Sequence, residues 1–447
     1  MIAHRIRSRL MFAALVCLVL FPDVSVAVGW SDTPAPASEA VLFELRLAEK
    51  QGDWFRAADL YGQLARQNPQ VTSYRVSQLA ALRRGRFGKR LEDRAYRHFL
   101  GQTNLAEALS ILTDVCARLQ QTYVDARSVP LERLFRSGVE EIELGLSDPL
   151  FASRFLPGRS PQQISQYVSV LHERLGHPPR KPVELIAAVQ ELATHGARLL
   201  GMRPELVVLE MAAGVCNGLD QYTTFLIPEA DAGPKSEDTS DASISEPRFL
   251  ETASRIGYLR IQHFDDKTVS LLDNGMARLT NSGMRVLILD LRGNPGGLLS
   301  AAVDVADRFI ARGVLVTTHG QIREYNRVYK ARGQAQISVP LIVLIDGDTA
   351  SSAELVAAAL HDLHRGTLLG QRSFGKGTIQ ETVRLRGGVG ITLTVARFST
   401  PRGQAVEPSG VDPDILVIGP ASEAGMAPDT QLQAALDLAR TMGAMGP

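Results

Sequence analysis

The stretch Leu341-Ile-Val-Leu-Ile-Asp-Gly-Asp-Thr-Ala-Ser-Ser-Ala-Glu354 begins as five apolar residues, passes through a short polar turn and continues into the helical pattern of residues 352–363. An apolar run without alternation is typical of a strand that is buried on both faces of its sheet. The chain before it repeats this character, with expected strands at 256–261 and 285–290 and expected helices at 269–281 and 298–311. Strands that alternate with helices predict an α/β domain whose sheet is covered by helices on both faces.

Two of the expected strands lead directly into segments rich in glycine and small hydroxyl residues. One is Asp290-Leu-Arg-Gly-Asn-Pro-Gly-Gly297, where glycines allow a sharp turn and leave backbone N–H groups exposed. The other is the turn in 346–354, which puts a serine at the start of a helix. Taken alone, that serine is an ordinary helix cap, because serine is a favoured capping residue. Since ligands bind at the carboxyl ends of the strands in such domains, both turns are candidate site segments.

A third segment changes the interpretation of the serine. In Ser373-Phe-Gly-Lys376-Gly a single lysine stands between two glycines, so the backbone on either side of it can press against another segment. The alternative is a solvated loop lysine. Acyl transfer needs a nucleophile, a base and amide donors for the oxyanion. Lysine can be that base where burial lowers its pKa, and a Ser–Lys pair is an accepted variant of the Ser-His-Asp triad.

Histidine and metal chemistry find little support in the sequence. His361 and His364 lie on one expected helix, where they are surface or packing residues, and His263 ends an expected strand. The chain lacks a helical His-Glu-x-x-His motif and clustered cysteines, so no metal and no other cofactor is expected. Lysine plus arginine number 48 and aspartate plus glutamate number 48, so no overall charge would draw the chain onto nucleic acid.

Five motifs in order make the chain resemble the carboxyl-terminal processing, or tail-specific, protease family over residues 217–414. They are Asp220-Gln-Tyr-Thr-Thr-Phe-Leu, Asp290-Leu-Arg-Gly-Asn-Pro-Gly-Gly, Thr349-Ala-Ser-Ser-Ala-Glu, Phe374-Gly-Lys-Gly-Thr-Ile-Gln380 and Leu393-Thr-Val-Ala-Arg-Phe-Ser-Thr-Pro401-Arg-Gly, with Gly410-Val-Asp-Pro-Asp414 after the last. The resemblance implies a serine endopeptidase that cleaves protein or peptide substrates without a cofactor. It also implies a ClpP/crotonase-like α/β catalytic domain in which helices cover a mixed sheet.

The resemblance assigns roles to particular residues. The family's nucleophile corresponds to Ser351, three residues before the glutamate of its motif, and its base to Lys376, 25 residues later. The third member corresponds to Gln380, which would orient the lysine amine. The oxyanion hole would use the amide of Ser352 and a glycine amide, here that of Gly296. Because Ser352 replaces an alanine of the family's motif, it is also a rival nucleophile.

The chain departs from the family between Leu226 and Ile256. Most members carry a PDZ domain there, whereas only 29 residues intervene here, and residues 231–250 are largely polar and indicate a linker. We therefore expect no PDZ domain. PDZ domains capture free C-termini by strand addition, so selection of substrates by their C-terminus is in question. Recognition is expected to lie in the helical N-terminal region or with an adaptor that these helices bind.

The region before the linker is expected to be all-helical. Residues 38–101 resemble tetratricopeptide units, because Gly52-Asp-Trp-Phe-Arg-Ala57 is followed by Gly85-Arg-Phe87 at a 33-residue spacing. Such units stack helices into binding surfaces, although two helices can also pack without that role. Residues 102–230 continue with apolar residues at helical spacing. Cys116 and Cys216 both lie in helical patterns, and both a disulfide and two buried thiols remain open.

The N-terminus has the order of a secretory leader. Three arginines at positions 5, 7 and 9 precede twelve residues of an apolar run, 10–21, and the small-residue sequence Ser25-Val-Ala27. A membrane span needs about 20 apolar residues, so we expect cleavage after Ala27 rather than an anchor, and export to the periplasm or the cell exterior.

The expected division is a leader (1–27), tetratricopeptide-like helices (38–101), a helical domain (102–230), a linker (231–250), the catalytic domain (251–420) and a C-terminal helix or tail (421–447).

Two other functions are compatible with these patterns. One is a scaffold that recruits partners through its helical repeats and has lost catalysis, but the intact Ser351, Lys376 and Gln380 argue against it. The other is a different acyl-transfer or lyase chemistry on the same fold, because fold does not fix function. A dependence on coenzyme A would reveal it, yet the sequence has no phosphate-binding loop or basic patch to support one.

Overall fold

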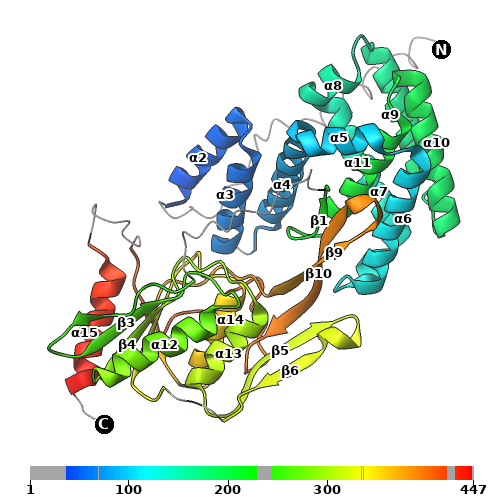
Figure 1. Cartoon of the computed structure of the whole chain (residues 1–447). Coiled ribbons are helices and arrows are strands. Elements are labelled where there is room, and N and C mark those ends of the chain that lie inside the picture. Colours follow the sequence, from blue (N-terminus) through cyan, green and yellow to red (C-terminus); the bar gives the residue numbers. More distant parts are fainter. Residues whose placement is uncertain are drawn as a thin grey trace.

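The computed structural model describes residues 37–444 apart from positions 69, 229–242, 334, 336 and 420–427. The predicted leader lies outside the described residues, as do most of the predicted linker and the start of the predicted tail. Figure 1 shows a helical part and an α/β part that are connected by long strands. No helix among the described residues is long and apolar enough to cross a membrane.

The helical part confirms the all-helical prediction as far as Asn217. Its elements are α2 (Ala37–Gln51), α3 (Trp54–Gln67), α4 (Thr72–Glu92), α5 (Arg94–Gln102), α6 (Leu105–Thr122), η1 (Ala126–Ser128), α7 (Leu131–Ser147), α8 (Pro149–Phe155), α9 (Pro161–Leu175), α10 (Pro182–Leu200) and α11 (Pro204–Asn217). Local sequence sets several of the starts. The side chains of Asp53 and Asn104 accept hydrogen bonds from first-turn amides of α3 and α6, which satisfies donors that a helix start leaves free.

Buried ion pairs tie α4 to the helices that follow it. Arg90 is 6% exposed, and its guanidinium lies 2.8 Å from Glu141 and 2.5 Å from Glu210, both fully buried.

Gly52 occupies the turn between α2 and α3, whereas Gly85 lies inside α4 against the ring of Phe55. The two glycines that give the 33-residue spacing thus lie in different structural settings, one in a turn and the other inside a helix.

The α/β part is built on a mixed six-stranded sheet with the order β11-β8-β7-β4-β3-β2. Its strands are β2 (Arg248–Glu251), β3 (Ile256–Arg260), β4 (Val286–Asp290), β7 (Leu341–Ile345), β8 (Thr367–Gly370) and β11 (Ile415–Leu416). All neighbours are parallel except β2 and β3. The helices are α12 (Thr268–Asn281), α13 (Leu299–Phe309), α14 (Ser352–Asp362) and α15 (Thr430–Ala444). The first three contribute to a core on one face and α15 to a core on the other, which confirms the predicted α/β architecture.

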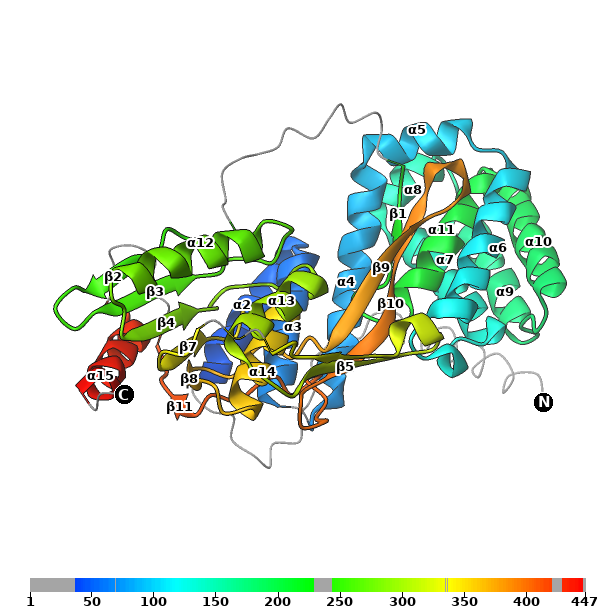
Figure 2. The same cartoon turned by 60° about the horizontal axis from the view of Figure 1, so that its bottom comes forward.

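A second, antiparallel sheet connects the two parts. It has the order β1-β10-β5-β6, with β9 also paired to β10. Its strands are β1 (Thr224–Leu226), β5 (Val314–Gly320), β6 (Arg327–Lys330), β9 (Thr378–Arg384) and β10 (Gly390–Ser399), with the 3-10 turns η2 (Arg323–Tyr325) and η3 (Arg386–Gly388). The β9–β10 hairpin reaches into the helical part, where β10 contacts α6 (Figure 2). Val389, Ile391, Leu393 and Val395 belong to the core of the helical part, so the two parts share one hydrophobic cluster.

The two cysteines of the helical part are free thiols. Cys116 of α6 and Cys216 of α11 are both buried, and no disulfide joins them. Burial raises the pKa of Cys116 to about 12, so its reactive thiolate form is suppressed. This resolves the alternative that the sequence left open in favour of two buried thiols.

Candidate active site

Ser351 lies where β7 has ended and α14 begins, and its backbone is strained. Its φ is +56° and its ψ is −121°, a conformation that residues with a side chain rarely adopt. Its neighbour Ser352 is 3% exposed, and the Ser352 hydroxyl donates to the Gly297 carbonyl at 3.2 Å. Ser351 is instead only partly buried. The turn therefore presents the first serine and packs the second one away.

The carboxylate of Glu354 joins the serine turn to the lysine segment. It is fully buried, and its Oε2 accepts the N–H of Ser351 and the N–H of Lys376, each at 2.8 Å. Its Oε1 accepts the Ser373 hydroxyl at 2.5 Å and the Gly375 N–H at 2.7 Å. Burial raises the pKa of Glu354, and these four hydrogen bonds act in the opposite direction because they favour the carboxylate. One side chain thus holds both candidate catalytic backbones.

The lysine segment is pressed against the loop at 407–408, as its glycines predict. A Cβ added to Gly375 would lie 2.5 Å from the Pro408 carbonyl oxygen, and one on Gly377 would lie 2.7 Å from the Glu407 amide nitrogen. No side chain fits at those distances. The sequence-based prediction that glycines on both sides of Lys376 permit a close backbone approach is therefore confirmed.

The amine of Lys376 is largely buried and lies on an aromatic ring. Its Nζ is 4.7 Å from the centroid of the Tyr222 ring, which comes from the Asp220 motif after α11. Burial lowers the pKa of Lys376, while the nearby carboxylates of Glu354 and Glu407 raise it. Among the described residues, no hydrogen bond joins Nζ to the hydroxyl of Ser351. The structure thus holds the lysine amine on the tyrosine face, with its base form favoured by burial.

Gln380 lies on β9, four residues after the lysine. Its Nε2 donates to the hydroxyl oxygens of Thr378 at 2.9 Å and Thr394 at 3.5 Å. The second partner is on β10, so the amide bridges the two strands of the hairpin. Among the described residues, Gln380 has no hydrogen bond to Lys376.

The glycine loop lies directly against the serine turn. A Cβ added to Gly296 would lie 2.8 Å from the Cβ of Ser351 and 3.1 Å from the Ser352 amide nitrogen, which only glycine allows. The Gly296 N–H donates to Asn294 Oδ1 at 2.8 Å, so the predicted oxyanion donor is already bonded in this state. The N–H groups of Gly297 and Ser352 have no acceptor among the described residues. One backbone amide in the glycine loop and one in the serine turn therefore remain free of an acceptor among the described residues.

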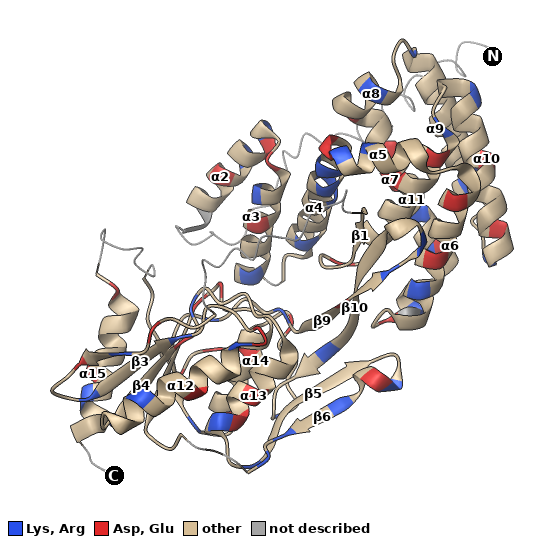
Figure 3. Ribbon diagram, in the orientation of Figure 1, with Lys and Arg blue, Asp and Glu red and all other residues tan. Residues whose placement is uncertain are grey.

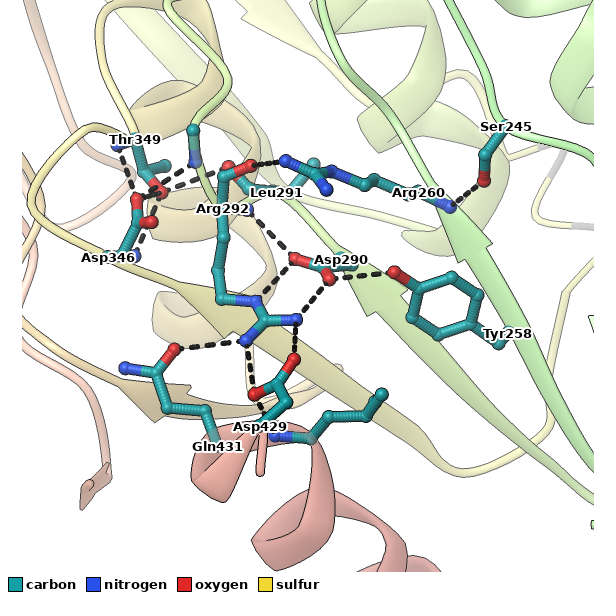
Figure 4. Close-up of polar contacts among 12 residues, drawn as sticks. Ser245, Tyr258, Arg260, Asp290, Leu291, Arg292, Asp346, Thr349, Asp429 and Gln431 are labelled. Carbon is teal, nitrogen blue, oxygen red and sulfur yellow. Dashed lines mark hydrogen bonds and ion pairs between the residues drawn. The ribbon is translucent and has the colours of Figure 1, made fainter. Parts of the chain in front are cut away.

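Several hydrogen bonds tie the glycine loop to the serine turn, and Figure 4 shows two of them. The Gly293 N–H donates to Asp346 Oδ1 at 3.0 Å, and the Thr349 hydroxyl donates to the Leu291 carbonyl at 3.0 Å. Both contacts link residues at the carboxyl ends of β4 and β7, which are parallel neighbours. The two turns that the sequence marked as candidate site segments therefore meet at one edge of the sheet.

A buried ion network fixes the base of the glycine loop (Figure 4). The Arg292 guanidinium, 5% exposed, is bonded to both oxygens of Asp290 at 2.9 and 2.7 Å and to both oxygens of Asp429 at 2.8 and 2.9 Å. Tyr258 donates to Asp290 Oδ2 at 2.8 Å, and Gln431 accepts from the guanidinium at 3.3 Å. Asp429 immediately precedes α15, so the network also anchors the C-terminal helix.

Replacing Arg292 by alanine is expected to lower the free energy of unfolding by about 3–5 kcal/mol. The reason is that Asp290 is fully buried and would keep its charge without a cationic partner. Urea denaturation followed by circular dichroism measures the loss. The exposed Arg372, whose ion pair with Asp412 is solvated on both sides, is the control, and Arg372→Ala should cost less than about 1 kcal/mol. Equal losses for both variants would contradict the role assigned to the network.

His361 and His364 lie away from these residues, as expected. His361 is near the end of α14, roughly 14 Å along the helix from Ser352. Its ring nitrogens lie 3.1 Å from Asp362 and 3.2 Å from Asp414, an arrangement that links α14 to the loop before β11. The histidines therefore pack and pair at the opposite end of the helix.

Sequence reasoning missed two residues of this site, Glu354 and Tyr222. Glu354 was quoted only as the end of a motif, although a glutamate three residues after a helix cap is a recognisable capping-box signal. Tyr222 also stands inside a motif, but no local signal says that its ring meets a lysine more than 150 residues away. Only the folded chain shows that contact.

Residues 255–417 match the family described as Peptidase family S41. A carboxyl-terminal-processing protease of Synechocystis sp. is 38% identical over 186 residues, which are 41% of this chain and 43% of the relative. A protein of the same description from Picosynechococcus sp. is 33% identical over 249 residues, 53% of this chain and 60% of the relative. The chain therefore spans about two fifths to three fifths of the length of these relatives.

Among solved structures, the chain is similar to one titled photosystem II D1 C-terminal processing protease. That similarity has a TM-score of 0.43 and 20% sequence identity, and it covers 69% of this chain and 93% of the other. A putative peptidase from Parabacteroides merdae gives a TM-score of 0.40 at 18% identity, over 61% of this chain and 88% of that one.

Proposed function

Because residues 255–417 form a domain of peptidase family S41, we propose that this chain is an exported serine endopeptidase of the carboxyl-terminal processing type. Its substrates would be proteins or peptides, cleaved through an acyl-enzyme by Ser351 and Lys376. The observation that carries the proposal is the Glu354 carboxylate, which bonds the backbone amides of both residues at 2.8 Å. The backbones of the proposed nucleophile and base are thus held in a fixed position relative to each other by one buried group.

In the proposed reaction, neutral Lys376 takes the proton of the Ser351 hydroxyl as the oxygen attacks a peptide carbonyl. The lysine then protonates the leaving amine, and water releases the acyl group by the same route. Lys376 would leave the Tyr222 face to reach the hydroxyl, and Gln380 would orient its amine. Burial assists the step, since it lowers the lysine pKa and so increases the neutral fraction.

The oxyanion would be held by backbone amides next to Ser351. The Ser352 N–H is free in the described structure and lies at the positive end of α14. The second donor would come from the glycine loop. Gly296, predicted from the resemblance, can serve only if Asn294 releases its N–H, whereas the Gly297 N–H needs no such release.

The choice of Ser351 over Ser352 is supported by exposure and by backbone shape. Ser352 is buried with its hydroxyl bonded to Gly297, so its oxygen is not presented to a substrate. Ser351 is partly exposed on a strained strand-to-helix turn, as nucleophiles on α/β folds often are.

The pH dependence of kcat/KM should report the lysine. Protonated Lys376 cannot accept the serine proton, so activity is expected to rise with pH, with a midpoint below the usual lysine pKa of about 10.4. Replacing Glu407 by glutamine removes a carboxylate that raises the Lys376 pKa, so the midpoint should move to lower pH. The measurement is kcat/KM for a fluorogenic peptide between pH 5 and about 10. If the midpoint in Glu407→Gln stays the same or moves to higher pH, the rise of activity with pH cannot be assigned to Lys376.

The direct test of the function uses residues 28–447 and an unfolded protein substrate, with products identified by mass spectrometry. Discrete internal cleavages that an active-site serine reagent abolishes are the expected result. If the protein is inert alone and stays inert with every candidate adaptor captured on its N-terminal helices, the peptidase proposal fails. Export has its own test, because secreted or periplasmic protein should begin at Val28.

A further inference from the structure

A cavity of about 190 Å³ opens between the N-terminal helices and the lysine segment. Three separate parts of the chain enclose it. They are helices α3 and α4 with Arg66 and Arg75, the Asp220 motif, and the catalytic loops with Phe374, Gly375 and Glu407. Because Gly375 directly precedes Lys376, a ligand in the cavity would lie beside the proposed catalytic residues. No part of the proposed reaction uses this space.

Arg66 is the dominant cation of the cavity. Its guanidinium carbon lies 4.3 Å from the centroid of the Phe374 ring, so the group is stacked on the lysine segment and oriented by it. Burial lowers the pKa of Arg66, yet an arginine remains charged in proteins. Among the described residues it has neither a hydrogen bond nor an ion pair, although its guanidinium carries five donors. A half-buried cation of this kind is suited to a carboxylate ligand.

Arg75 of α4 is the second arginine that lines the cavity. It is exposed on α4, and it too has no hydrogen bond or ion pair to any described residue. Figure 3 shows several Lys and Arg positions along the ribbon of α4. Arg83, Arg86 and Arg90 of that helix are already bonded to carboxylates or carbonyls of the helical part, which leaves Arg75 as a cation at the cavity wall.

Two carboxylates, Asp220 and Glu407, also line the cavity, and among the described residues neither forms an ion pair with Arg66 or Arg75, although the charge of Arg75 lowers the pKa of Glu407. Asp220 Oδ1 accepts the N–H groups of Tyr222 and Thr223, and its Oδ2 accepts the Tyr123 hydroxyl, so both oxygens already have partners. Glu407 is the open case, because its Oε2 is buried and has no partner among the described residues. Burial raises the pKa of Glu407, and its charge acts on Lys376.

We propose that Arg66 and Arg75 form a subsite that binds a carboxylate of the substrate chain, either its C-terminal carboxylate or an Asp or Glu side chain. The inference rests on the proposed peptidase function and gives its substrate a chemical feature. Two arginines from α3 and α4 would position the chain, while Phe374 connects the subsite to the lysine segment. The unpaired carboxylate of Glu407 could instead favour a basic side chain of the substrate. A preference for such a side chain would overturn the proposal.

The test measures binding and cleavage separately, on full-length mature protein. Binding uses Ser351→Ala protein and fluorescein-labelled peptides by fluorescence anisotropy, and cleavage uses the unmodified serine. The peptide set has one sequence in four forms: free C-terminus, C-terminal amide, amide with one Asp, and amide with one Lys. Variants are Arg66→Gln, Arg66→Lys and Arg75→Gln. The control is Arg84→Gln. Arg84 lies on α4, as Arg75 does, but it stacks on Trp54 and does not line the cavity.

The expected result is that Arg66→Gln raises Kd and KM roughly tenfold to a hundredfold for peptides with a carboxylate, and leaves the plain amide unchanged. Arg66→Lys should recover part of the loss, Arg75→Gln should show a smaller loss, and Arg84→Gln none. The free terminus and the Asp peptide distinguish the two sources of carboxylate. A purely structural role of Arg66 would instead weaken all four peptides equally.

The outcomes separate this inference from the peptidase proposal. Carboxylate-dependent binding without any cleavage would support the subsite and contradict the proposed peptidase function. Cleavage with no preference among the four peptides, or with a preference for the Lys peptide, would overturn the subsite and leave the peptidase intact. Protein that neither binds nor cleaves any of the peptides would remove both.

Discussion

Ser351→Ala is expected to lower kcat/KM by on the order of 10⁵-fold, the largest loss of any single substitution in this chain. Without the hydroxyl no acyl-enzyme can form, and only binding and the oxyanion amides would remain. Lys376→Ala should cost on the order of 10³- to 10⁴-fold, because it removes the base but leaves the nucleophile in place. Cleavage of a defined peptide, with quantified products over several hours, measures all of these rates.

The matched control is Ser352→Ala, which removes a hydroxyl one residue away and retains the backbone amide. It should keep kcat/KM within about tenfold, because the Ser352 oxygen is buried against the Gly297 carbonyl and only the amide is assigned a role. The reverse pattern, with Ser352→Ala inactive and Ser351→Ala active, would make Ser352 the nucleophile. Trapping the acyl-enzyme with a serine-directed inhibitor and mapping the modified peptide gives the same answer independently.

Glu354→Gln is expected to have the largest effect outside the proposed nucleophile and base, and it should act on both rate and stability. The carboxylate accepts four hydrogen bonds, whereas a glutamine amide has one acceptor oxygen and presents N–H groups to the remaining donors. Two buried donors without an acceptor should cost about 2–4 kcal/mol of unfolding free energy. Because the amides of Ser351 and Lys376 lose their common partner, kcat should fall about 10²- to 10³-fold.

The readout that distinguishes positioning from simple destabilisation is kcat measured well below the midpoint of unfolding, together with KM. A change in kcat at unchanged KM fits a clamp on the catalytic groups, since substrate contacts would be intact. Glu324→Gln, at an exposed position of η2, is the control and should change neither quantity. A fully folded Glu354→Gln protein with normal kcat would show that the clamp has no part in catalysis.

The α/β part was predictable because its central strands are continuous apolar runs. Leu341–Ile345 and Val286–Asp290 are buried at every position, so their sequence and their place in the sheet agree. The approach of the glycine loop to the serine turn followed from the same logic, since parallel strands end at one edge. These features depend on local composition and on general rules of topology, both of which a single sequence contains.

The contacts between the two parts could not be predicted in the same way. The long strand β10 has alternating Thr and apolar residues, typical of a half-buried strand, but nothing in that alternation names the helices it meets. The Lys376–Tyr222 contact and the Arg66–Phe374 contact join segments that are far apart in sequence. Such pairings depend on the relative placement of whole layers, which local signals do not encode.

The β9–β10 hairpin has a consequence for how this protein can change over generations. Because its apolar residues complete the core of the N-terminal helices, a substitution in α6 or α11 has to be matched by residues encoded some 200 positions later. Recombination that replaced residues 37–226 alone would set a foreign surface against the old hairpin. The unit that relatives can exchange consists of those helices together with residues 378–395. This unit is therefore encoded by two separate stretches of the gene.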